Sequence, residues 1–218
     1  MTALVRYYLA LTVHAQRYLA PLLLHATALT VFTVNDAGPL TGSYVVVAGS
    51  LLLVTCWLTV TIVNLEDPAR RAVTLVTAGG AGRVFTAEVA LSLLAGVALI
   101  AVGTVFPILS GRHEVTAAAV GVGVVAQATT VGVGVAVGLI CSRLVVPRPG
   151  WSLILALVVI VAIPLTPGLP PVNPMLRLMS SDRPPADQLP PIAIGLAVAV
   201  ALLAASAVAT HRIALRRD

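Results

Sequence analysis

The chain has 218 residues, of which 59% are hydrophobic and 10% charged, and its formal net charge is +5. A soluble domain carries about 25% charged residues, so this composition excludes an ordinary soluble protein and predicts an all-α, polytopic membrane protein. All thirteen basic residues are arginine. Because a phosphate-binding P-loop requires lysine, the chain cannot hold that kind of ATPase site, and we expect it not to be an enzyme.

The first predicted element is an amphipathic helix over residues 2–18. Leu4 and Tyr8 lie on one helical face, and Arg6 and Arg17 lie on the other. Such a helix is suited to the membrane surface, so the pattern predicts an interfacial elbow helix. One continuous tilted helix through the first apolar stretch is the alternative.

Six apolar stretches follow, and each is long enough to be considered a membrane span. With the N-terminus in the cytoplasm, ten of the thirteen arginines fall in cytoplasmic segments, as the positive-inside rule requires. We therefore expect one transmembrane domain, residues 1–218, with both termini cytoplasmic. The predicted spans are 19–34, 44–63, 84–109, 115–146, 151–168 and 191–210.

Between the second and third spans lies a charged segment, residues 64–83. Asp67 is a good N-cap, Pro68 suits the first helical position, and Gly79 with Gly80 provides a stop. These signals predict a cytoplasmic helix within the segment, and we expect this helix to display side chains to a partner. Its displayed residues are Arg70, Arg71 and Thr74.

The fourth span is rich in glycine. Gly134 and Gly138 have the spacing that lets two membrane helices approach closely. The stripe therefore predicts close helix packing, and a dimer face is the alternative. Gln127 and Thr130 lie near mid-depth in the same span, where they would contact a transported molecule or form hydrogen bonds between helices.

The external loop, residues 169–190, is rich in proline but has a helical centre. Asn173 is its predicted cap, with Pro174 at the first helical position. Met175, Leu176 and Met179 would then dip into the outer interface as an external gate, or the segment is simply an ordered connection.

The chain resembles the permease subunits of type II ATP-binding-cassette exporters. The resemblance rests on the elbow helix, the six spans, and a segment that begins at Glu66 and ends at the Gly82-Arg83 step. It implies that the segment contains a coupling helix, with Glu66, Asp67, Arg70, Arg71, Thr74 and Arg83 as ATPase-coupling residues. It also implies a separate ATPase subunit that holds ATP and Mg, and a second permease subunit, identical or not.

We therefore expect a permease of the cytoplasmic membrane, surrounded by lipid, that exports an apolar or amphipathic cargo such as a drug, lipid or hydrophobic natural product. A haem- or cofactor-export subunit of similar build and a non-transporting scaffold protein are the alternatives. Arginine-rich loops account for the basic charge, so no nucleic-acid partner is expected. With two isolated cysteines and no metal-ligand spacing, we expect no metal and no cofactor in this chain.

Overall fold

The computed structural model describes residues 1–146 and 149–215, and this part of the chain is helical without strands. Arg148, Arg216 and Arg217, three of the ten arginines predicted to be cytoplasmic, lie outside the described residues. The helices are α1 (Thr2–Ala15), α2 (Leu19–Thr33), α3 (Leu40–Val63), α4 (Pro68–Ala78), α5 (Ala81–Ser110), α6 (Ala117–Ile140), α7 (Pro149–Leu165), α8 (Val172–Met179) and α9 (Pro185–Leu215).

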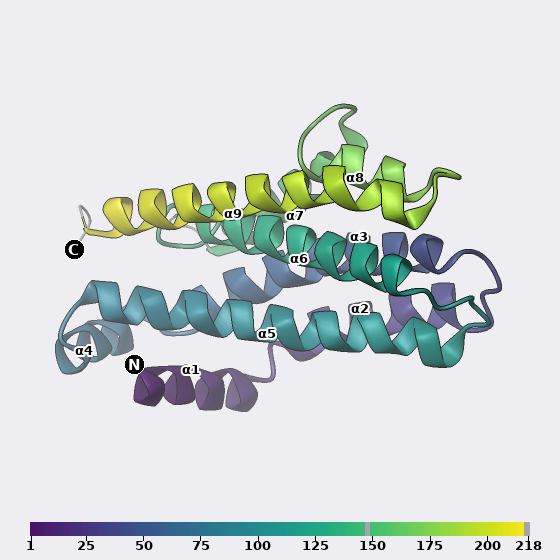
Figure 1. Cartoon of the computed structure of the whole chain (residues 1–218). Coiled ribbons are helices and arrows are strands. Elements are labelled where there is room, and N and C mark those ends of the chain that lie inside the picture. The colour runs from purple at the N-terminus through teal and green to yellow at the C-terminus, as the bar shows by residue number, and fades with distance from the viewer. Residues whose placement is uncertain (147–148, 216–218) are drawn as a thin grey trace.

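The long helices run side by side as an elongated bundle (Figure 1). Helix α6 packs most extensively against α3 and α9, and α3 also packs against α5 and α2. Figure 1 shows α4 lying across one end of the bundle, where α1 starts and α9 ends. The chain therefore brings its first helix, its last helix and α4 to the same end.

Four helices in the described part are long and apolar enough to cross a membrane, namely α3, α5, α6 and α9. Their most apolar windows have mean hydropathies between 1.8 and 2.6. Two thirds of that window is buried in α3 and α6, compared with 28% in α5 and 17% in α9. Helices α3 and α6 thus form the interior, and α5 and α9 present apolar faces outward. Six spans were predicted, but α2 and α7 have only 15 and 17 residues.

The glycine stripe of α6 faces α3 of the same chain. A Cβ atom on Gly134 would lie 2.8 Å from the carbonyl oxygen of Leu52, and one on Gly138 would lie 2.9 Å from that of Cys56. Both distances are shorter than side-chain contacts allow, so glycine is required for this close approach. The stripe therefore serves packing within the chain rather than a dimer face.

Several helix boundaries differ from the predicted ones. Helix α1 ends at Ala15, and the bend follows at Gln16, which adopts a left-handed conformation with φ 53°. Pro21 lies inside the first turn of α2, where a missing backbone N–H leaves no intrahelical bond unmade. Helix α9 begins at Pro185, six residues before the predicted span, because proline is well suited to a first helical position.

The cap predicted for the external helix is also wrong. Helix α8 begins at Val172 with Pro171 as its N-cap, so Asn173 lies within the helix. The Asn173 amide donates to the carbonyl oxygen of Pro164 at 2.6 Å, and its oxygen accepts from the Gly168 amide at 3.3 Å. Asn173 therefore ties α8 to the end of α7.

At the end opposite α4, Asp36 joins the two connections that precede α3 and α6. Its carboxylate accepts from the Gly38 amide at 2.9 Å and from the Ser43 hydroxyl at 2.7 Å. The amide of Arg112 donates to the Asp36 carbonyl at 2.9 Å. The hydrogen bond from Gly38, which has the larger effect, and that from Ser43 both lower the pKa of Asp36 below its ordinary value.

Candidate functional site: a buried polar cluster beneath helix α4

Helix α4 has the start and stop that its sequence predicts. The Asp67 side chain accepts from the Arg70 amide at 2.9 Å, and Pro68 occupies the first helical turn. Gly79 adopts φ 75°, and the Gly80 amide donates to the Leu75 carbonyl at 3.0 Å, which closes the last turn. This helix is therefore specified locally, independently of the bundle.

The two faces of α4 differ in chemistry. The inward face carries Arg71 and Thr74 toward the bundle, and Leu75 packs against an apolar cluster formed by α1, α3 and α5. The outward face carries two valines, Val73 and Val76, which are 65% and 83% exposed. Leaving two large apolar side chains in water is unfavourable, so this short face is suited to contact with another molecule.

Glu66 lies just before α4 and is the centre of the inward contacts. It is 2% exposed, and its carboxylate accepts hydrogen bonds from the hydroxyls of Tyr7 and Tyr8, both at 2.9 Å, and of Thr74 at 2.8 Å. Its backbone carbonyl accepts from the Arg143 guanidinium. Glu66 thus connects α1, α4 and the segment that follows α6.

The Tyr8 phenol is held in its protonated, donating form. Tyr8 is fully buried. Burial, followed by the nearby carboxylates of Glu88 and Glu66, raises the pKa of Tyr8 far above that of an exposed tyrosine. The phenol therefore remains a hydrogen-bond donor to Glu66 throughout the physiological pH range.

A second carboxylate, Glu88 of α5, completes the cluster. Its Oε1 accepts from Arg71 Nη1 at 2.5 Å, and the two side chains are 1% and 13% exposed. Arg6 and Arg17, the arginines of the predicted elbow helix, are exposed, and the partner of Glu88 is Arg71. Burial, the largest single influence, lowers the pKa of Arg71, but the charge and hydrogen bond of Glu88, together with Tyr8 and Glu66, outweigh it and raise that pKa. Arg71 is therefore charged.

Arg143 supplies the fourth charge, from the turn that follows α6. Its amide donates to the side-chain oxygen of Asn64 at 2.9 Å. Burial and the charge of Arg71 lower the pKa of Arg143, while the carboxylates of Glu88 and Glu66 oppose that shift. A buried charge is tolerated only when it is paired. Two carboxylates and two guanidiniums balance one another here, and the resulting set is termed the polar cluster: Glu66, Glu88, Arg71, Arg143, Tyr8 and Thr74.

The six residues predicted for coupling divide into two groups. Asp67, Arg70 and Arg83 are exposed, whereas the remaining three, Glu66, Arg71 and Thr74, belong to the polar cluster. The Arg83 guanidinium donates to the Ala78 carbonyl at 3.2 Å, at the C-terminal end of α4. The exposed group lies where a partner protein can touch it, and the buried group fixes the position of α4.

The polar cluster was largely missed at the sequence level. The sequence pattern places Tyr8 on the apolar face of an interfacial helix and does not single out Arg143. One signal was present in the sequence: an acidic residue one turn inside an apolar span, Glu88, requires a buried cation nearby. The sequence did not indicate which arginine that would be.

The polar residues of α6 that were predicted to lie near mid-depth take part in helix contacts. Gln127 is fully buried, and its amide donates to Thr104 of α5 at 3.3 Å. The Thr130 hydroxyl donates to the Gln127 carbonyl at 2.9 Å. The Gln127 bond connects α5 to α6, and the Thr130 bond satisfies the Thr130 hydroxyl within α6. These contacts, like the close approach of Gly134 and Gly138 to α3, belong to helix packing; contact with a transported molecule stays a prediction.

The residues named as an external gate lie on α8. Met175 and Met179 are buried against the bundle, and Leu176 is partly buried against the same core. Helix α8 packs against α3, α6, α7 and α9. It therefore contacts four helices at once, and opening a path there would require α8 to move.

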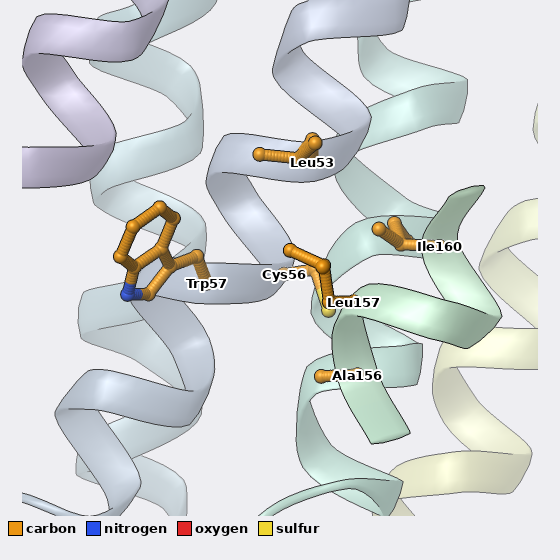
Figure 2. Close-up of a pocket in the computed structure, with 6 residues that line it drawn as sticks. All are labelled: Leu53, Cys56, Trp57, Ala156, Leu157 and Ile160. Atoms are coloured by element: carbon orange, nitrogen blue, oxygen red, sulfur yellow. The ribbon is translucent and has the colours of Figure 1, made fainter. Parts of the chain in front are cut away.

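A small cavity lies between α3 and α7 (Figure 2). Its volume is about 40 Å³, and Leu53 and Cys56 of α3 face Ala156, Leu157 and Ile160 of α7. Pockets for drug-sized ligands have volumes of roughly 300–1,000 Å³, so this cavity is a packing defect rather than a cargo site.

Metal-ligating residues do not gather anywhere in the part of the chain that the structure describes: no three His, Cys, Asp or Glu side chains come together there. The two cysteines are buried free thiols within that part. The contacts that the polar cluster itself makes are charge pairing and hydrogen bonding. No family model, curated protein or solved structure matches this chain.

Proposed function

We propose that this chain is the permease subunit of an ATP-binding-cassette exporter, and that α4 is the helix on which a separate ATPase subunit docks. The observation that carries the proposal is the two-sided construction of α4. Its inward face is fixed by the polar cluster, while its outward face presents Val73, Val76 and Arg70 across the end of the bundle. A helix that only connects α3 to α5 needs neither feature.

The polar cluster supplies a route for mechanical coupling. Glu66 contacts α1 and the segment after α6, and Arg71 contacts α5. Pulling α4 away from these elements would expose buried charges without partners, which is strongly unfavourable. A displacement of α4 by an ATPase would therefore move α1, α5 and the segment after α6 together with it.

The remaining parts of the proposal follow from the same layout. Helices α2 and α7 complete six crossings of the cytoplasmic membrane, with shorter helices tolerated by local thinning of the bilayer. The end that carries α4 faces the cytoplasm, where ATP and Mg are held by the ATPase. A second permease subunit completes the transporter, and the apolar outward faces of α5 and α9 fit an apolar or amphipathic cargo.

The test is a charge placed on the outward face of α4. Val76→Asp is expected to weaken association with the ATPase at least about tenfold, the effect of losing a central interface residue. Val115→Asp is the matched control, because Val115 is an exposed valine in the connection between α5 and α6. Co-purification of the ATPase and cargo-stimulated ATP hydrolysis are measured for both variants.

The choice of Val76 follows from the structure. An Arg70→Glu, Arg71→Glu double variant would be the obvious test from sequence, but Arg71 is buried against Glu88, so its reversal would disturb the fold. Val76→Asp changes only an exposed side chain. Association and stimulated hydrolysis equal to those of the unmodified protein would refute the docking role of α4.

A further inference from the structure

An apolar groove lies where α1 bends into α2. It has a volume of about 270 Å³ and is bounded by α1, α2, α3 and α5. The bend at Gln16 turns α1 away from the line of α2. Leu58 and Ile62 of α3 and Ala98 of α5 line the groove together with residues from α1 and α2.

The one hydroxyl that α1 contributes to the groove, that of Thr12, is not free to bind a ligand. Thr12 lines the groove, but its hydroxyl donates to the carbonyl oxygen of Tyr8 at 2.7 Å. Apart from Tyr18, the remaining lining residues are Leu, Val, Ile and Ala. A polar solute would lose its hydration there without replacement, whereas a hydrocarbon chain would be accommodated.

A second protein helix fits this groove poorly. Membrane helices associate closely through small residues, and the glycine pair Gly134 and Gly138 is already used between α6 and α3. The groove is lined mainly by large aliphatic side chains, which hold a neighbouring helix at a distance. A flexible acyl chain adapts to such a surface.

The charge around the groove selects the lipid. The first 35 residues contain no acidic residue. Arg17 directly precedes the groove residue Tyr18, and Arg6, His14 and Arg17 are all exposed on or next to α1. Basic residues at a membrane surface attract anionic headgroups. We propose that the groove binds one acyl chain of an anionic phospholipid, whose headgroup is held by Arg17. This inference does not depend on the export function.

The experiment uses the full chain in lipid nanodiscs containing a phosphatidylglycerol with a photoreactive group in its acyl chain. After illumination, peptide mass spectrometry is expected to locate the label on α5 between Leu91 and Leu99. Ala98→Phe fills the groove and is expected to reduce this labelling to background. Ala101→Phe, a matched exposed alanine outside the groove, is expected to leave the labelling unchanged.

The headgroup is tested separately. The matching phosphatidylcholine probe is expected to label the groove about fivefold less, as the loss of one arginine–lipid attraction predicts. Arg17→Gln is expected to remove this preference. Equal labelling by both probes, or equal effects of the two alanine variants, would overturn the proposal in favour of unselective surrounding lipid. A dimer in native mass spectrometry with the groove protected from label would overturn it in favour of a second copy.

Discussion

Replacing the buried ion pair between Arg71 and Glu88 gives a quantitative test of the polar cluster. A solvent-exposed pair contributes about 0–1 kcal/mol, but these side chains are only 13% and 1% exposed. Removing one partner leaves the other charge buried and unpaired. We therefore expect Arg71→Met and Glu88→Leu each to reduce the free energy of unfolding by about 3–5 kcal/mol.

The double variant is expected to behave differently. Without Arg71 and Glu88, the cluster still contains Glu66 and Arg143, so its charge remains balanced. The second oxygen of Glu88 and one nitrogen of Arg143 have no hydrogen-bond partner in the described part of the chain, so the native arrangement is not fully satisfied. Replacing a buried pair with apolar residues is often neutral, and we expect the double variant to unfold within about 1 kcal/mol of the unmodified protein.

The assay is equilibrium unfolding in mixed detergent micelles, followed by tryptophan fluorescence. The double-mutant cycle isolates the interaction between the two side chains. The single and double values above imply an interaction energy of about 5 kcal/mol or more. Additive losses, with the double variant the least stable of all, would refute the reasoning, because they would mean that each charge acts independently of the other.

Two further predictions concern the rest of the bundle. Gly138→Ala is expected to destabilise the protein by about 1–3 kcal/mol through overpacking against α3, whereas Gly49→Ala, where a Cβ meets nothing within 4 Å, is expected to be neutral or stabilising; thermal unfolding of the two variants checks this. The hydrogen bond from the Gly38 amide, and then that from Ser43, lower the pKa of Asp36. The ionised carboxylate therefore stabilises the folded protein fully above the ordinary pKa of 3.8, and this stabilisation is lost as the pH falls through the lower folded-state pKa. Asp36→Asn should therefore lower the unfolding temperature at pH 7, with a difference that shrinks below pH 3.8; a difference that is constant with pH would contradict this.

Local signals in the sequence determined α4 well. Asp67, Pro68 and Gly79 act within one or two turns of the chain, so their effect could be anticipated without knowledge of the tertiary structure. The close approach at Gly138 was also foreseeable, because small residues in an apolar helix have few other uses. The neighbour that Gly138 contacts could not be predicted, since the choice between α3 and a second chain depends on tertiary packing.

The polar cluster could not be assembled in the same way. Its members come from α1, α4, α5 and the segment after α6, and the pairing of Glu88 with Arg71 rather than Arg6 is decided by how those elements pack. The prolines near the start of the last helix led to a wrong boundary. Pro190 and Pro191 suggested a loop, yet they lie inside α9, because the flanking apolar sequence and the start at Pro185 favour a helix more strongly than two prolines oppose it.

The central claim is that α4 is the docking site for an ATPase. The most direct measurement places a photoreactive amino acid at Val76, crosslinks in native membranes, and identifies the attached protein by mass spectrometry, with the same amino acid at Val115 as control. We expect a protein with a P-loop to be attached at Val76 and absent from Val115. Repeated capture at Val76 of lipid alone, or of a protein without an ATPase site, would contradict it and favour a scaffold.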